Sequence, residues 1–434
     1  MSARTEHAWR WVPTLYFAQG LPYAIVMTVS VVMYKTLGIS NTDIALYTSW
    51  LYLPWVIKPL WSPVVEIFGT KRLWILAMQI AIGATLALVA LTLPASRFFQ
   101  LSLAMLWLLA FTSATHDIAA DGFYMLALER HAQATFVGLR SAFWRIAALT
   151  GQGGIVYLAG ELGNFTGDVV LAWSIVFAIT AGLFALLCAW HWLSLARPAR
   201  DRAVAGGRGE PWREFFETFA AFFRRDDIGP ILAFLVLFRF AESQALKLVT
   251  PFLLDPVAKG GLGLTTSDVG IAYGTIGVIA LTAGGILGGL AIARWGLDRC
   301  LWPMTFSIHV PNLVFLWLAV AQPQDFTLVC AALAIEQFGY GFGFAAFLMF
   351  MIVVAAGVAS SGMQSGNPRQ TAHYAICTGF MALGMMLPGM WSGWLQEHLG
   401  YPRFFGWVCM ATIPAFLVVA WVRIPKGFGA SEAA

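Results

Sequence analysis

The sequence contains little charge. Charged residues make up 11% of the 434 residues and hydrophobic residues 59%, whereas soluble globular domains average roughly 25% charged residues. With a mean hydropathy of +0.74, a soluble domain is excluded. The net charge of +4 is small and follows from the topology described below, so no nucleic-acid-binding surface is predicted.

Several motifs are also absent. The five cysteines have no C-x-x-C spacing and fall in or beside apolar segments, so we expect packing residues and predict neither a metal site nor a cofactor. They are Cys188, Cys300, Cys330, Cys377 and Cys409. No G-x-x-x-x-G-K-[ST] loop occurs, which argues against an ATP-driven pump. The first apolar segment lacks a small-residue cleavage site and is expected to be a retained helix.

What the sequence does contain is a series of long apolar segments. Each has the length of about 20 residues that a helix needs to cross roughly 30 Å of hydrocarbon. The twelve segments run over residues 9–36, 44–68, 73–93, 101–128, 136–160, 169–195, 228–254, 269–293, 301–320, 326–355, 372–396 and 405–422. The chain is therefore predicted to be an all-α membrane protein.

The two halves of the chain repeat one another. Residues 38–44 (GISNTDI) recur as residues 263–269 (GLTTSDV), and the basic turn at residues 69–74 is echoed at residues 296–302. Each motif lies between two apolar segments, so both halves share one helix order. Parallel repeats of this kind are typical of transporters whose two halves rock against each other.

This repeat predicts two six-helix bundles, over residues 1–195 and 228–434. The polar stretch between them, residues 196–227, is predicted to be a cytoplasmic linker. It contains an amphipathic run at residues 212–219 that suits a helix in the membrane interface. A tether that lets the halves move is the simpler interpretation, and a regulatory or partner-binding role is the alternative.

The distribution of basic residues predicts the topology. Arg97, Lys259 and Arg403 are the basic residues of the loops on one side, and arginines and lysines concentrate on the other side. Because basic loops stay in the cytoplasm, both termini are predicted to be cytoplasmic, in a multi-pass inner-membrane protein.

Charged residues inside membrane segments are expensive and mark functional candidates. Asp117 and Asp121 share one face of the fourth segment, and Arg145 and Arg140 lie at matching depths on the fifth. Two ion pairs are predicted, Asp117 with Arg145 and Asp121 with Arg140. They either hold the helices together or take part in conformational switching and proton handling.

His116 has several interpretations. It either titrates protons or faces the solute, or it is a buried histidine satisfied by a neighbour. His116 and Asp121 also form an H-x-x-x-x-D pattern found in membrane-bound acyltransferases. Residues five apart on a continuous helix point roughly 140° away from each other, which disfavours that enzyme.

A second set of polar residues lies on the first, seventh and tenth segments, which are related to the fourth by the repeat. Arg239, Glu242 and Lys247 occupy the seventh segment, Gln19 the first, and Glu336 the tenth. Such charges cannot face lipid, so a water-filled central cavity is predicted. Aromatic residues on these helices favour a sugar or amino-sugar solute. Glu242, beside Arg239, is the preferred candidate for proton coupling.

Residues 54–63 (PWVIKPLWSP) and 113–119 (SATHDIA), with the repeated turns, resemble the AmpG-like branch of the major facilitator superfamily. This branch includes muropeptide permeases. The resemblance implies a fold of twelve helices in two bundles and proton-driven import from the periplasm.

We therefore predict a non-enzymatic, proton-coupled symporter, active as a monomer, that imports a sugar-derived or cell-wall-derived solute such as an anhydro-muropeptide. An exporter of metabolites or drugs, an importer of a siderophore-like or acyl-CoA-like solute, and a non-transporting receptor are the alternatives. The expected partners are a small-molecule solute, protons and the lipid bilayer.

The candidate residues fall into three groups. Solute binding is assigned to Gln19, Tyr23, His116, Tyr124, Lys247, Gln337 and Tyr340. Proton coupling is assigned to Asp117, Asp121, Arg140, Arg145, Arg239, Glu242 and Glu336. Gating at the cytoplasmic edge is assigned to Glu66, Arg72 and Arg299, although topology signals alone would also explain these basic residues.

Overall fold

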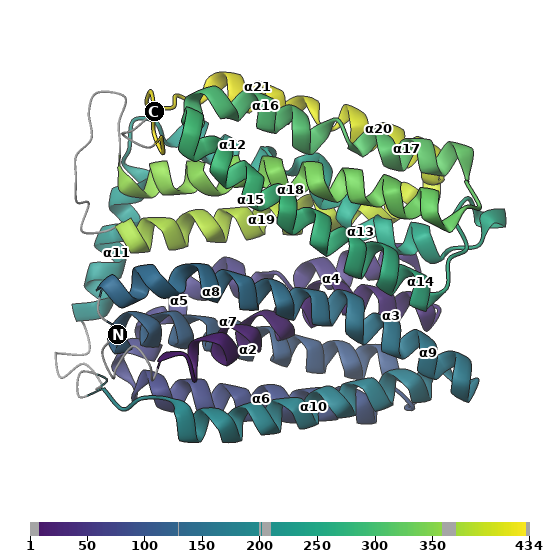
Figure 1. Ribbon diagram of the computed structural model, residues 1–434, viewed down its shortest axis with the longest axis horizontal. Helices are drawn as coiled ribbons and strands as arrows, with labels where there is room; N and C mark the ends of the chain where they lie inside the picture. Colours follow the sequence, from purple (N-terminus) through teal and green to yellow (C-terminus); the bar gives the residue numbers. More distant parts are fainter. Residues whose placement is uncertain (1–7, 129, 199–200, 202–209, 358–369, 431–434) are drawn as a thin grey trace. The chain divides into compact units, whose positions relative to one another are not determined.

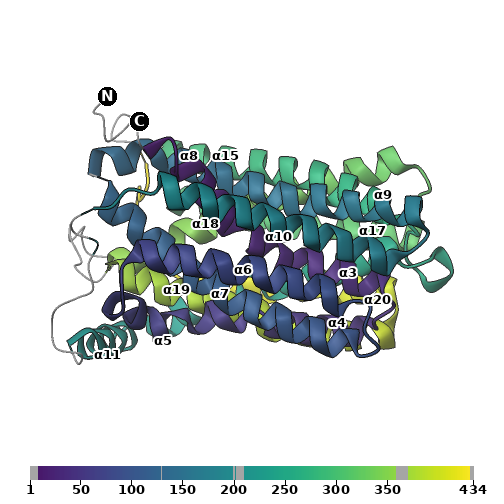
Figure 2. The ribbon, with the colours of Figure 1, turned by 90° about the horizontal axis from the view of Figure 1, so that it is seen from below.

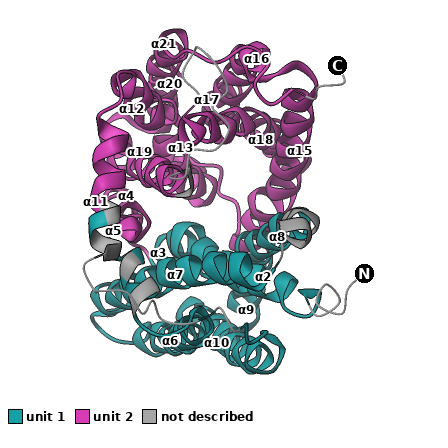
Figure 3. Cartoon of the chain, turned by 90° about the vertical axis from the view of Figure 1, so that its left-hand side faces the viewer, with its two compact units in different colours: residues 1–37, 60–214 teal, residues 38–59, 215–434 magenta. Residues whose placement is uncertain are grey.

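The computed structural model describes residues 8–128, 130–198, 201, 210–357 and 370–430. Some helical side chains, including that of Glu66, lie outside the description. Regular structure in the described residues is helical throughout. The chain forms two compact units, coloured separately in Figure 3. Unit 1 comprises residues 1–37 and 60–214, and unit 2 comprises residues 38–59 and 215–434.

Unit 1 is a bundle of long helices in which α6 and α10 run side by side (Figures 1 and 2). Its helices are α2 (Val12–Ala24), α3 (Ser30–Thr36), α6 (Lys71–Thr92), α7 (Phe98–Ala127), α8 (Arg130–Leu149), α9 (Val156–Thr166) and α10 (Val169–Ser194). Two π-helical turns, η1 (Ile25–Val29) and η2 (Thr150–Ile155), continue α2 into α3 and α8 into α9. The helix α5 (Leu53–Ile67) contains the boundary with unit 2.

Unit 2 packs the remaining helices around α18 and α19. They are α4 (Asn41–Trp50), α12 (Ile228–Leu237), α13 (Phe240–Leu254), α14 (Thr266–Val269), α15 (Val278–Trp295), α16 (Leu297–His309), α17 (Asn312–Ala321), α18 (Phe326–Ala356), α19 (Gln370–Leu399), α20 (Tyr401–Met410) and α21 (Ile413–Trp421). A π-helical stretch, η4 (Gly270–Gly277), joins α14 to α15, and a 3-10 turn, η3 (Val257–Lys259), follows α13.

The predicted all-α membrane fold is confirmed. Within the described part of the chain, nine helical segments are long and apolar enough to cross a membrane. The other three expected segments are also helical but are broken or polar. Residues 44–68 break between α4 and α5, residues 228–254 break between α12 and α13, and residues 136–160 carry charges and a π-helical turn. The boundaries of the two predicted bundles stay a prediction.

The repeated sequence motif forms a helix cap in both halves. Gly38 and Gly263 adopt φ values of 83° and 68°, which favour glycine. Ser40 Oγ then accepts a hydrogen bond from the Asp43 amide at 3.0 Å. In the second copy, Thr265 and Asp268 cap each other reciprocally. The repeat therefore encodes the start of α4 and of α14.

Glycines set the close packing of α15 against α18 in unit 2. A Cβ built on Gly341 would lie 2.0 Å from the carbonyl oxygen of Leu281, and one built on Gly284 would lie 2.2 Å from that of Phe338. No side chain fits at such distances, so the two backbones approach because these residues are glycines.

The helix expected in the linker is present as α11 (Glu210–Phe223). Its apolar residues differ in burial. Phe222 is fully buried in unit 2, with its ring 5.5 Å from that of His373, whereas Phe216 is exposed. The C-terminal part of α11 is therefore anchored on unit 2. Its placement in the membrane interface stays a prediction.

We expect Gly341→Ala to lower the melting temperature of the purified protein, because the added methyl group overpacks the α15–α18 contact by about 1–3 kcal/mol. Gly289→Ala is the matched control, since a Cβ there meets nothing within 4 Å. The control should be neutral or slightly stabilising, as alanine favours helix over glycine. Equal melting temperatures for the two variants would contradict the close approach.

Candidate functional site

The predicted ion pair between Asp121 and Arg140 is present in unit 1. Arg140 Nη2 lies 3.2 Å from Asp121 Oδ1, with both side chains about one third exposed (34% and 36%). Tyr16 donates its hydroxyl proton to the same carboxylate oxygen at 3.1 Å. The guanidinium also lies over the rings of Tyr16 and Tyr124, at 4.6 and 5.6 Å. We call these four residues, from α2, α7 and α8, the Asp121 cluster.

One helical turn away, Asp117 accepts a hydrogen bond from the side-chain amide of Gln19 on α2. This contact brings together two residues that were predicted to lie at the cavity. The predicted pair of Asp117 with Arg145 stays a prediction. Tyr23, also on α2, packs its ring 5.7 Å from that of Trp144 on α8. The face of α2 that carries these residues therefore contacts both α7 and α8.

His116 points to a different part of unit 1. It is fully buried, and its Nε2 lies 3.1 Å from Gln79 Nε2 on α6. The Gln79 Oε1 in turn lies 3.0 Å from His191 Nδ1, and His191 Nε2 lies 2.9 Å from Thr14 Oγ1. Gln79 therefore satisfies Nε2 of His116, whereas Nδ1 has no hydrogen-bond partner among the described residues. The choice between a structural and a solute-facing His116 stays open. The helix α7 is continuous here, so His116 and Asp121 face different helices, which argues against the acyltransferase interpretation.

In unit 2, Arg239 and Glu242 form a buried ion pair. Arg239 Nη2 lies 2.5 Å from Glu242 Oε1, and Nε lies 3.2 Å from both carboxylate oxygens. Arg239 Nη2 also donates to the Tyr340 hydroxyl at 2.6 Å. The guanidinium lies over the ring of Phe344 at 4.7 Å. We call Arg239, Glu242 and Tyr340 the Arg239 cluster.

The helix break between α12 and α13 positions this cluster. Phe238 and Arg239 form the turn between the two helices, so Arg239 precedes the first turn of α13 and reaches Glu242 three residues later. Such a geometry gives both Nε and Nη2 of the guanidinium an acceptor, and a buried charge requires such partners.

The remaining predicted residues of unit 2 are also buried. Gln337 donates to the Glu336 carboxylate at 2.8 Å on α18. Lys247 donates from Nζ to Thr48 Oγ1 at 2.9 Å and lies 5.1 Å from the centre of the Tyr52 ring. The tenth and seventh segments therefore bring their polar residues to the interior of unit 2. The water-filled central cavity expected between the two halves stays a prediction.

The predicted gating residues have different surroundings. Arg72 donates to the Trp192 carbonyl at 2.6 Å, and its backbone amide donates to Asp201 at 3.1 Å. Arg299 is exposed on the first turn of α16. The side chain of Glu66 lies outside the described residues. The gating role of all three stays a prediction.

Sequence reasoning missed a buried polar cluster at the start of α4. Asn41 Nδ2 donates to Gln396 Oε1 at 2.7 Å and to the Tyr401 hydroxyl oxygen at 3.0 Å. Tyr401 donates to Asp255 Oδ2 at 2.6 Å. We call Asn41, Asp255, Gln396 and Tyr401 the Asn41 cluster. Its members are spread along the sequence, and the only local signal was the position of Asn41 in the repeated motif.

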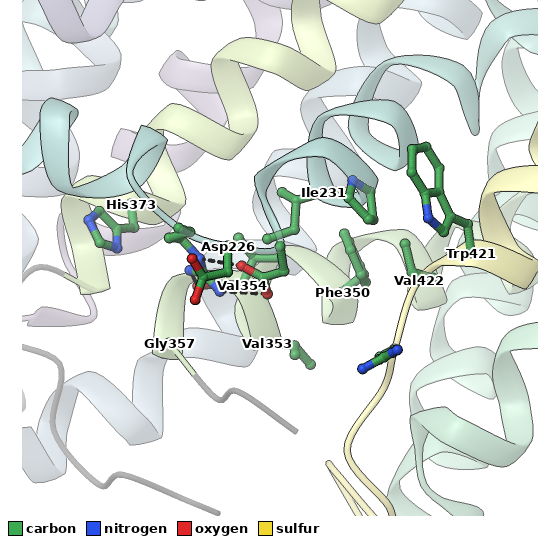
Figure 4. Close-up of a pocket in the computed structure, with 13 residues that line it drawn as sticks. Asp226, Ile231, Phe350, Val353, Val354, Gly357, His373, Trp421 and Val422 are labelled. Atoms are coloured by element: carbon green, nitrogen blue, oxygen red, sulfur yellow. Dashed lines mark hydrogen bonds and ion pairs between the residues drawn. The ribbon is translucent and has the colours of Figure 1, made fainter. Parts of the chain in front are cut away.

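A cavity of about 740 Å³ lies elsewhere in unit 2. Figure 4 shows His373 and Trp421 at opposite sides of it. Arg225, at its edge, is held by Asp227 at 3.1 Å and by the Val354 carbonyl at 2.7 Å. None of the predicted solute-binding or coupling residues lines this cavity.

The fold and these buried charges are those of a membrane transport protein, and sequence comparison agrees. Residues 14–367 match the family model of the Major Facilitator Superfamily, so the chain belongs to this superfamily. It is a multi-pass membrane transporter and not an enzyme.

Similar proteins cover nearly the whole chain. A protein of Haemophilus influenzae with no characterized function is 27% identical over 94% of this chain and 92% of its own length. The anhydromuropeptide permease of Escherichia coli K12 is 24% identical over 94% of this chain and 78% of its own length. A crystal structure of the nucleoside transporter NupG superposes with a TM-score of 0.67 at 18% identity, covering 96% of this chain and 99% of that one. The expected resemblance to the AmpG-like branch is confirmed.

We expect Asp121→Asn to reduce stability and uptake, because it leaves the Arg140 guanidinium without its carboxylate. A simultaneous Arg140→Gln should restore part of the loss. For a pair that is one third exposed, we expect a coupling free energy of about 1 kcal/mol in a double-mutant cycle of thermal unfolding.

The matched control combines Asp121→Asn with Arg299→Gln. Arg299 is an exposed residue of unit 2. Here the two effects should simply add. An additive result for Asp121 and Arg140 as well would show that their contact contributes nothing to stability.

Proposed function

We propose that this transporter is a proton-coupled symporter of the inner membrane. In this proposal it works as a monomer with both termini in the cytoplasm. It imports a sugar-derived or cell-wall-derived solute, such as an anhydro-muropeptide.

The observation that carries the solute class is the similarity to the anhydromuropeptide permease, which covers 94% of this chain and 78% of the permease. At 24% identity this similarity supports a class of solute and does not identify one molecule. The polar residues fit such a solute, because amide and hydroxyl groups bind sugar hydroxyls and aromatic faces pack against sugar rings. We assign solute contact to Gln19, Tyr23, Tyr124, Gln337 and Tyr340, with Lys247 treated separately below.

Two buried carboxylates support proton coupling. Glu242 and Glu336 are 3% and 5% exposed inside membrane-spanning segments, where ionisable residues commonly relay protons. Glu242 is held in its buried ion pair with Arg239. Protonation of Glu242 would break its pair with Arg239 and leave the guanidinium with Tyr340. A proton could in this way change the contacts of α13 with α18.

Uptake of a radiolabelled anhydro-muropeptide into vesicles containing the purified protein should rise with an inward proton gradient. A protonophore should abolish this accumulation. Uptake that ignores the proton gradient and follows a sodium gradient would overturn proton coupling. Efflux from right-side-out vesicles together with accumulation in inside-out vesicles would indicate an exporter.

Glu242→Gln should abolish accumulation against a gradient but leave counterflow of the same solute largely intact, because counterflow needs no net proton movement. Glu161→Gln, an exposed glutamate on α9, is the matched control and should accumulate solute normally. Loss of counterflow together with a lower melting temperature would assign Glu242 a structural role with Arg239. Normal accumulation by Glu242→Gln would move coupling to Glu336 or Asp117.

A further inference from the structure

Lys247 is a buried charge whose partners are unusually weak. It lies within α13 and is 3% exposed. An ammonium group inside a membrane-spanning helix is costly and normally pairs with a carboxylate. Arg239, on the same predicted membrane segment, has such a partner in Glu242. In the described part of the chain, Lys247 has none.

The contacts of Lys247 come from residues 38–59. Its Nζ donates one hydrogen bond to Thr48 Oγ1 at 2.9 Å, and it lies 5.1 Å from the centre of the Tyr52 ring. An ammonium group can donate several hydrogen bonds, and a neutral hydroxyl and an aromatic face balance its charge only partly. The charge is therefore covered by α4 and the following turn without being neutralised.

A second unsatisfied polar group lies beside it. Ser49 is fully buried, and its hydroxyl has no hydrogen-bond partner among the described residues. Gly389 of α19 connects the two groups, since a Cβ built there would lie 2.9 Å from Ser49 Oγ and 3.4 Å from Lys247 Cγ. Three groups therefore meet in one small region. They are the Lys247 side chain, the unpartnered Ser49 hydroxyl and the backbone of α19 at Gly389.

A purely structural role explains this arrangement poorly. Methionine fills nearly the same volume as lysine, and an ion buried with only neutral partners contributes little to stability. Unsatisfied buried polar groups are instead characteristic of sites that receive a ligand.

We propose that Lys247 binds a carboxylate of the transported solute, with the unpartnered Ser49 hydroxyl donating a hydrogen bond to the same group. The proposal rests on the proposed import function and adds to it that the solute is an anion. A carboxylate suits this region because its single charge matches one ammonium, whereas a phosphate dianion would leave a negative charge buried. Opening of the Lys247–Thr48 hydrogen bond during alternating access, with α4 staying close to α13, would give the solute access to both Lys247 and Ser49.

The first experiment needs no transported solute. Lys247→Met should leave the melting temperature of the purified protein unchanged or raised, because it removes a poorly compensated buried charge. Lys259→Met, exposed on η3, is the matched control for the loss of one positive charge. A clear fall in melting temperature for Lys247→Met alone would show that the lysine holds α4 and α13 together, and would overturn the proposal.

The second experiment uses lactate as a simple carboxylate probe and lactamide as its neutral analogue, at constant ionic strength. Lactate should raise the melting temperature of the unsubstituted protein and of Lys259→Met, and lactamide should not. Lys247→Met should lose the lactate effect. No lactate effect in the unsubstituted protein, or an equal effect in Lys247→Met, would overturn the proposal.

The third experiment separates this inference from the proposed solute class. An anhydro-muropeptide with free carboxylates should bind the unsubstituted protein at least tenfold more tightly than its fully amidated form, as expected for a charge-assisted contact. Lys247→Met should remove that preference. If neither form binds while the lactate response persists, the muropeptide assignment fails and the carboxylate site stands. If both forms bind equally well, the carboxylate site fails and import of a muropeptide stands.

Discussion

A charged side chain inside a membrane-spanning helix needs its partner from the protein, because hydrocarbon offers neither hydrogen bonds nor screening. The interior of each unit is organised by this constraint. In unit 1, Asp121 draws Arg140 and Tyr16 together and so joins α7, α8 and α2. In unit 2, Arg239 joins α13 to α18 through Glu242 and Tyr340. Lys247 meets the constraint only partly, because its described contacts are a hydroxyl and an aromatic ring.

The constraint also explains what could be predicted from the sequence. Apolar length fixes where helices cross the membrane, so all twelve expected segments correspond to helices of the structure. The pair of Asp121 and Arg140 could be predicted because both residues lie about equally far along the chain from the loop that joins their antiparallel helices. The breaks at Arg239 and after α4, and the π-helical turns, escaped prediction. Apolar periodicity marks the length of a segment and does not report a local break within it.

The contacts of the candidate site also divide into those that the sequence predicted and those that it did not. Sequence placed Glu242 beside Arg239 because three residues along a helix bring side chains together. It grouped His116 with Asp117 because they are neighbours in the chain. Adjacent residues on a helix point about 100° apart, and the structure directs His116 to Gln79 and Asp117 to Gln19. The partners of Lys247 and Asn41 lie hundreds of residues away or in the other half of the repeat, where one sequence carries no pairing signal.

The position of residues 38–59 connects these contacts to transport. By sequence they belong to the first half of the repeat, yet they pack within unit 2. Besides the apolar packing of Ala45, polar contacts hold them: Asn41 with Gln396 and Tyr401, and Thr48 with Lys247. Each hydrogen bond contributes only about 1 kcal/mol net, because water can replace the lost partner when the contact opens. An apolar seal of the same extent would expose hydrocarbon surface on opening. A polar seal can therefore open and close reversibly, and at Lys247 a solute carboxylate would compete with water for the place that Thr48 leaves.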